Sequence, residues 1–135
     1  MTENAVNTAV TSASSPAIPA ETSAVPPATR TANRPLGTPL GKHPTRVLFL
    51  GAGELGKEVT LELMRLGAWV CAADSYAGAP AQQVAHEYRA LDMANAAELQ
   101  ALFDEIKPDI IVPEVEAIAT DVLAGTAAAG AQVVP

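Results

Sequence analysis

Residues Arg46–Val59 read RVLFLGAGELGKEV and decide the fold. They begin with five largely apolar residues, RVLFL, a pattern typical of a strand that is buried in a sheet. Glycines follow at positions 51, 53 and 56, in the spacing G-x-G-x-x-G, and helical periodicity begins directly after the second of them. A buried strand, a glycine turn and a helix in this order predict the first unit of a parallel α/β sheet.

The chain from residue 45 onward alternates short apolar runs with helical stretches. We expect further strands over 69–73, 88–91, 109–112 and 132–134, and helices over 54–66, 80–85, 95–106 and 118–129. In the first helix, Val59, Leu63 and Leu66 are expected to face the core. The pattern predicts an α/β fold, a doubly wound, Rossmann-like parallel sheet of five strands in the order 3-2-1-4-5.

Composition excludes several classes of protein. The 135 residues carry 15 acidic and 8 basic side chains, a net charge of −7, whereas proteins that bind nucleic acid concentrate Lys and Arg. Gly, Pro or charged residues interrupt every apolar run well before the length of a membrane-spanning helix. Cys71 is the only cysteine, so an internal disulfide is impossible and a reducing, cytoplasmic location is expected.

Residues 1–44 differ from the rest of the chain. They hold 7 of the 11 prolines and no aromatic residue, so they offer little apolar area to offset the entropy of ordering. We therefore expect a disordered Pro/Ala/Thr-rich tail over 1–44 and one folded domain over 45–135. The last expected strand has no closing helix after it, which favours the first domain of a longer protein.

The glycine turn has two interpretations. As a dinucleotide fingerprint it would bind NAD(P), with Asp74, 18 residues after Gly56, accepting from a ribose hydroxyl. Alternatively, the glycines only allow a tight turn and close helix packing. Glu54 argues against NAD, because its carboxylate would lie in the first turn of the helix, where the pyrophosphate would bind.

A second group of carboxylates follows the expected fourth strand. Glu114 and Glu116 lie in the run PEVEAIATD, and the carboxyl ends of parallel strands meet at the crevice where the strand order reverses. We therefore expect Glu54 and Glu114 to converge there and to bind hydroxyl or ammonium donors. The alternative is that these glutamates only place charge at a helix N-terminus, an interpretation that suits Glu116 better than Glu114.

Two other side chains have simpler interpretations. His86 and Glu87 are adjacent, but no second His or Cys stands at a metal-ligand spacing, so we interpret them as a surface pair. Cys71 lies among apolar neighbours in the second strand and is expected to be a small core residue.

Three blocks of sequence together resemble one family. They are RVLFLGAGELGKEV from residue 46, ADSYAGAPAQQVAH from residue 73 and IVPEVEAIATD from residue 111. In this order and spacing, they resemble the N-terminal domain of formate-dependent phosphoribosylglycinamide formyltransferases. The resemblance covers 45–135. It implies that Glu54, Leu55 and Glu114 contact glycinamide ribonucleotide, and it assigns no contact to Glu116 or Asp121.

The resemblance also implies an activity for a longer protein. In that family an ATP-grasp ligase of purine biosynthesis uses ATP, Mg²⁺ and formate to formylate glycinamide ribonucleotide, as a cytoplasmic homodimer. The ATP-grasp domain, with its ATP and magnesium residues, is missing from this chain, so the fragment alone is expected to be inactive. The alternatives are a related carboxylase acting on aminoimidazole ribonucleotide, an NAD(P)-binding module of an oxidoreductase, and a fold without activity.

Overall fold

A computed structural model describes residues 35–134. The described residues all lie in one compact unit of the chain. Its elements are β1 (Arg46–Leu50), α1 (Glu54–Arg65), β2 (Trp69–Asp74), the 3-10 helix η1 (Pro80–Gln83), β3 (Glu87–Ala90), α2 (Ala96–Ile106), β4 (Ile110–Pro113), α3 (Thr120–Ala128) and β5 (Gln132–Val133). None of these helices is long and apolar enough to cross a bilayer.

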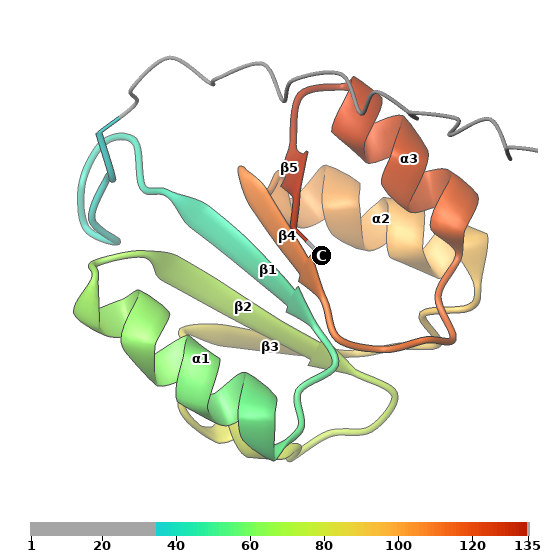
Figure 1. Ribbon diagram of the computed structural model, residues 1–135, viewed down its shortest axis with the longest axis horizontal. Coiled ribbons are helices and arrows are strands. Elements are labelled where there is room, and N and C mark those ends of the chain that lie inside the picture. Colours follow the sequence, from blue (N-terminus) through green and yellow to red (C-terminus); the bar gives the residue numbers. More distant parts are fainter. Residues whose placement is uncertain (1–34, 135) are drawn as a thin grey trace, which may run out of the picture. The chain divides into compact units, whose positions relative to one another are not determined.

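The five strands form one parallel sheet in the order β3-β2-β1-β4-β5, which confirms the predicted topology (Figure 1). β1 lies at the centre, where Leu50 is in register with Ala73 of β2 and with Pro113 of β4. The order reverses at β1, because the chain adds β2 and β3 on one side and β4 and β5 on the other. The carboxyl ends of β1, β2 and β4 therefore meet at one place.

Helices cover the sheet from both sides (Figure 1). Leu48 and Leu50 of β1 belong to the main core cluster, together with Leu99, Leu102, Phe103 and Ile106 of α2 and Leu123 of α3. Val47 points the other way and packs with Leu63 and Met64 of α1. This alternation along β1 is what a strand buried on both faces requires.

The inward face of α1 differs from the prediction. Its fully buried residues are Gly56 and Thr60, with Leu63 partly buried beside them, while Leu66 is 66% exposed just after the helix ends. The apolar spacing that pointed to Leu66 was therefore misleading. Small residues allow α1 to approach the sheet closely, and they set which face of the helix is buried.

The third helix also differs from the prediction. α3 begins at Thr120 rather than at residue 118, because the N–H of Ile118 donates to the carbonyl of Glu116 in the preceding turn and the N–H of Ala119 donates to the carbonyl of Met93, which lies before α2. Residues 1–34 of the predicted tail lie outside the described residues. Within 35–44 the structure shows turns and a hydrogen bond from Gly37 to the hydroxyl of Thr45 (2.9 Å).

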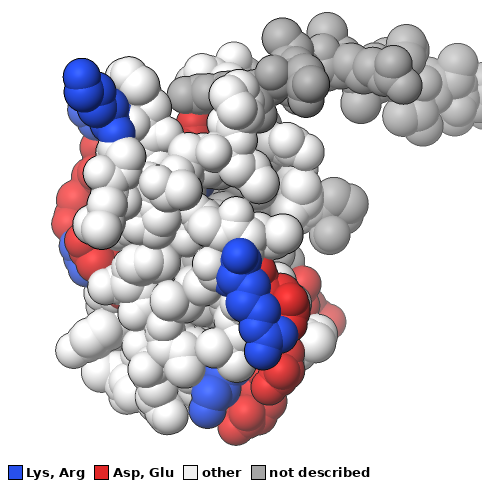
Figure 2. Space-filling model, turned by 90° about the vertical axis from the view of Figure 1, so that its left-hand side faces the viewer, with Lys and Arg blue, Asp and Glu red and all other residues white. Residues whose placement is uncertain are grey.

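Two arginines in the described region form ion pairs. Arg65 pairs with Glu62, and Arg89 of β3 bridges Glu87 (3.0 Å) and Glu105 of α2 (2.5 Å). The hydrogen bond from Arg89 holds the pKa of Glu105 below its usual range. The face seen in Figure 2 carries its charged side chains in groups at the margins, with a broad uncharged area between them.

Candidate functional site

A cavity of about 320 Å³ lies at the carboxyl ends of β1, β2 and β4. Its walls are Gly51, Gly53, Glu54, Leu55, Gly56, Asp74, Glu114 and Val115. All three residues predicted to form the site, Glu54, Leu55 and Glu114, line this one cavity. The structure therefore brings Glu54 and Glu114 to the same cavity.

Gly51 allows the loop after β4 to approach the turn after β1. Its φ of +105° is a conformation that L side chains rarely adopt. A Cβ on Gly51 would lie 2.8 Å from Cγ1 of Val115 and 3.2 Å from the carbonyl carbon of Glu114. This close approach brings Glu114 to the turn that carries Glu54.

The other two glycines of the motif have different surroundings. A Cβ on Gly56 would lie 2.9 Å from the carbonyl oxygen of Gly51 and 3.0 Å from the ring of Phe49, so Gly56 serves the packing of α1 on β1. Gly53 would meet nothing within 4 Å. It is the N-cap of α1, and no side-chain hydrogen bond caps the helix there. Gly53 therefore leaves the first turn of α1 open toward the cavity.

Glu114 follows β4 directly. Its backbone N–H donates to the carbonyl of Leu50 at 2.7 Å, which continues the pairing of β4 with β1 and fixes where the side chain starts. The side chains of Glu114 and Glu116 are both exposed, but only Glu114 is among the lining residues. The structure thus distinguishes the two glutamates: Glu114 lines the cavity, and Glu116 does not.

Asp74 has a different environment from the one that the dinucleotide interpretation requires. Oδ2 accepts the N–H of Ala52 at 2.7 Å, and Oδ1 accepts both the N–H (2.7 Å) and the hydroxyl (3.2 Å) of Ser75. Three protein donors therefore use this carboxylate. An acceptor for ribose hydroxyls would need its lone pairs directed to the ligand instead.

The charge of the cavity restricts what it can bind. Three of the lining side chains are carboxylates, Glu54, Asp74 and Glu114, and no lining residue within the described range is Lys or Arg. Like charges at short distances in a partly desolvated site repel, whereas ammonium and hydroxyl groups are favourable partners for carboxylates. The cavity is suited to a donor-rich ligand and unsuited to a pyrophosphate.

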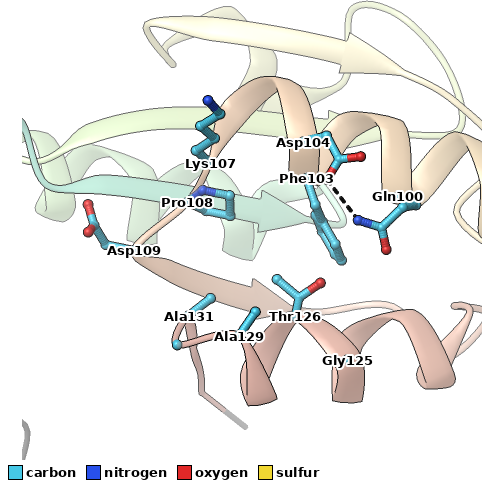
Figure 3. Close-up of a pocket in the computed structure, with 11 residues that line it drawn as sticks. Gln100, Phe103, Asp104, Lys107, Pro108, Asp109, Gly125, Thr126, Ala129 and Ala131 are labelled. Carbon is cyan, nitrogen blue, oxygen red and sulfur yellow. Dashed lines mark hydrogen bonds between the residues drawn. The ribbon is translucent and has the colours of Figure 1, made fainter.

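A larger groove of about 830 Å³ lies elsewhere, between the C-terminal parts of α2 and α3 (Figure 3). Three of its polar side chains already have partners: the amide of Gln100 donates to Asp104 (2.9 Å), and the hydroxyl of Thr126 donates to the Val122 carbonyl (2.9 Å). Asp109, which precedes β4, lines the groove, so the groove lies at the amino end of that strand. Size alone would have pointed to the opposite end of the sheet from the cavity that Glu54 and Glu114 line.

His86 and Cys71 have structural surroundings. Nδ1 of His86 accepts the N–H of Val70 at 3.1 Å, and its ring stacks on Trp69. Cys71 is fully buried, as predicted, and desolvation raises the pKa of its thiol to about 12. Among residues 35–134 no three His, Cys, Asp or Glu side chains form a group that could hold a metal ion.

Comparison with known proteins agrees with the sequence blocks. The family model of the ribonucleotide synthetase preATP-grasp domain matches residues 45–135. A formate-dependent phosphoribosylglycinamide formyltransferase from Bifidobacterium longum is 97% identical over 89 residues, which are 66% of this chain and 22% of that protein. The chain thus spans less than a quarter of the length of this relative.

Solved structures show the same domain. Glycinamide-RNase-transformylase T from Mycobacterium tuberculosis matches with a TM-score of 0.64 and 37% identity, over 67% of this chain and 28% of that chain. An N5-carboxyaminoimidazole synthetase from Staphylococcus aureus, complexed with ADP, matches with a TM-score of 0.57 and 25% identity, over 66% and 24% of the two chains. The strand order, the glycine turn and the matched span all agree: this chain belongs to the ribonucleotide synthetase preATP-grasp domain family.

Proposed function

We propose that this chain is the substrate-binding first part of an ATP-dependent ligase that formylates glycinamide ribonucleotide with formate in purine biosynthesis. The observation that carries the proposal is the small cavity in which Glu54 and Glu114 converge without a basic side chain among its lining residues. The names of the 97% identical relative and of the Mycobacterium tuberculosis structure support the choice of reaction.

The substrate offers the groups that this cavity can bind. A ribonucleotide of glycinamide carries ribose hydroxyls and an amine, which can donate hydrogen bonds to carboxylates. Its phosphate would be repelled by the lining carboxylates, so in our proposal basic residues in the rest of the enzyme hold it. In our proposal Glu54 and Glu114 accept from these donors, and Leu55, whose side chain is 66% exposed, packs against the sugar. The N–H groups in the first turn of α1 are available to one oxygen of the ligand.

The described residues do not fit ATP or Mg²⁺. The cavity offers no basic side chain to a triphosphate, and residues 35–134 hold no cluster of three metal-binding side chains. In our proposal this chain binds and orients the ribonucleotide, while ATP and Mg²⁺, which activate formate, belong to the rest of the enzyme. The ADP complex of the Staphylococcus aureus relative supports nucleotide use in the family.

Two further features of the complete enzyme rest on the family resemblance. We expect a cytoplasmic protein that acts as a homodimer. Gel filtration of the full-length protein with light scattering tests the oligomeric state, and a monomer at micromolar concentration would contradict it.

The NAD(P)-binding alternative has less support. It needs Asp74 as a ribose ligand, but this carboxylate already accepts two backbone N–H groups, and Glu54 and Glu114 would face the pyrophosphate. The repulsion between these charges opposes binding.

The chain itself allows a direct test. Glycinamide ribonucleotide is titrated into the ¹⁵N-labelled chain, with Glu54→Gln, Glu114→Gln and, as a matched control, Glu116→Gln, which removes a nearby exposed charge that does not line the cavity. We expect each of the first two to weaken binding roughly ten- to hundredfold, the value of a hydrogen bond to a charged group, and the control to bind normally. Equal weakening by Glu116→Gln, or tighter binding of NADH than of the ribonucleotide, would refute the proposal.

A further inference from the structure

The central residue of the glycine turn is held from two sides. Ala52 is fully buried, its N–H donates to Oδ2 of Asp74 at 2.7 Å, and its carbonyl accepts the N–H of Ala81 in η1 at 2.9 Å. Both polar groups of Ala52 therefore have partners that lie outside the turn itself. The next two residues along the chain are Gly53, the N-cap of α1, and Glu54.

Asp74 is itself fixed. Its second oxygen, Oδ1, accepts the N–H and the hydroxyl of Ser75, so the carboxylate cannot rotate without losing several hydrogen bonds at once. Hydrogen bonds from backbone N–H groups to a carboxylate are shorter and stronger than those between neutral groups. The contact with Ala52, at 2.7 Å, has the length expected of this class.

We call the two hydrogen bonds of Ala52, to Asp74 and to Ala81, the clamp. Gln82 stabilises the side of the clamp that carries Ala81. Its side chain is buried, its Oε1 accepts the N–H groups of Gly78 (2.7 Å) and Ala79 (3.2 Å), and its Nε2 donates to the carbonyls of Tyr76 (3.1 Å) and Arg89 (3.0 Å). One side chain thus ties the loop after β2 to β3. This loop leads into η1, whose Ala81 reaches the glycine turn.

The geometry points to Asp74 as the positioning residue of the glycine turn, which holds the peptide of Ala52 so that Glu54 faces Glu114 across the cavity. Asp74 acts through Ala52 and not by contact with the ligand. This inference rests on the proposed function of the cavity. It differs from the dinucleotide interpretation, in which the same carboxylate would be a ribose ligand.

The test separates the clamp from ligand binding. Amide hydrogen exchange of Ala52 is measured in the ligand-free chain for wild type, Asp74→Ala, Asp74→Asn and Ser75→Ala. We expect Asp74→Ala to speed exchange of Ala52 roughly ten- to hundredfold, as for one lost hydrogen bond to a charged group, while the amides of β4 stay protected. Asp74→Asn keeps an acceptor and should lose less protection, and Ser75→Ala should leave Ala52 unchanged.

Titration with glycinamide ribonucleotide supplies a second measurement. We expect affinity to follow Ala52 protection across the variants, so that Asp74→Asn retains most of the binding that Asp74→Ala loses. Unchanged Ala52 exchange in Asp74→Ala would overturn the inference, as would equal loss of affinity in Asp74→Ala and Asp74→Asn with Ala52 still protected. If Asp74→Ala does not fold, the amide chemical shift of Ala52, which reports its hydrogen bond to Asp74, is compared between Asp74→Asn and wild type. Identical shifts in these two proteins overturn the inference. Failure of the ribonucleotide to bind wild type refutes the proposed function and leaves the exchange result standing.

Discussion

The three glycines of the turn should differ sharply in their importance for stability. Gly51→Ala places a side chain where φ is +105° and where the new Cβ would lie 2.8 Å from Val115 and 3.2 Å from the backbone of Glu114. Left-handed strain costs about 1–2 kcal/mol and overpacking about 1–3 kcal/mol, so we expect a loss of about 2–5 kcal/mol. Gly56→Ala meets the backbone of Gly51 at 2.9 Å, but alanine favours the helix by about 1 kcal/mol, so its loss should be smaller.

Gly53→Ala is the matched control, because its φ is −68° and nothing lies within 4 Å of the new Cβ. We expect its free energy of unfolding to stay within about 1 kcal/mol of wild type, since a weaker N-cap is offset by lower entropy of the unfolded chain. Urea unfolding followed by the fluorescence of Trp69, the only tryptophan, measures all three variants. A Gly53→Ala loss as large as that of Gly51→Ala would refute the argument from geometry.

Three further predictions concern single side chains. The hydroxyl of Thr60 is buried without a partner in the described region, so Thr60→Val should stabilise the protein by about 1 kcal/mol. Thr126→Val is the control, because it removes a hydroxyl that has a hydrogen-bond partner, and it should not stabilise the protein. Thermal unfolding compares the two variants. Lys107 has a φ of +49° at the end of α2, a left-handed conformation that costs less for glycine. Lys107→Gly should therefore raise the free energy of unfolding in urea by about 1 kcal/mol. A lower free energy of unfolding would contradict the strain at this position. Because burial raises the pKa of Cys71 from 9.0 to about 12, the folded state retains a proton that the unfolded state releases, so stability should fall as pH rises above 9. The slope should be about 1.4 kcal/mol per pH unit and disappear in Cys71→Ala; an equal slope in that variant would exclude the thiol as its source.

The strand order and the position of the site could be predicted because they depend on local signals. Apolar runs identified the strands, and the glycine spacing identified where β1 turns into α1. Parallel pairing then has few topologies available, and the simplest of them, 3-2-1-4-5, brings the ends of β1 and β4 together at the reversal of strand order. The sequence alone therefore predicts that Glu54 and Glu114 lie in one crevice.

The buried face of α1 could not be predicted from apolar spacing. Leu66 continues the period of Val59 and Leu63, but the helix packs through Gly56 and Thr60, which contribute little to a hydrophobic pattern. Close packing depends on small side chains as much as on large apolar ones. The relevant signal in the sequence is Gly56, because a glycine that allows close helix packing also marks the face of the helix that is buried.

The hydrogen bonds around Ala52 were also beyond prediction. Asp74 accepts a hydrogen bond from Ala52, 22 residues away in sequence. Gln82 forms hydrogen bonds with four backbone groups of its loop and of β3. Such contacts depend on side-chain rotamers and on backbone directions that residue types do not specify. The sequence showed an acidic residue at the end of β2, but not whether its carboxylate would face a ligand or the protein.

The cavity takes its walls from the end of β2 and from the segments that follow β1 and β4, and β5 contributes none of them. β5 has two residues and lies at the edge of the sheet, where strands open at a lower free energy than the centre does. Detachment of β5 therefore leaves the walls of the cavity assembled, and a ligand in the cavity would bind the frayed and the closed forms alike. By mass action, we expect saturation with such a ligand to protect the central strands from exchange and to leave the opening equilibrium of β5 unchanged.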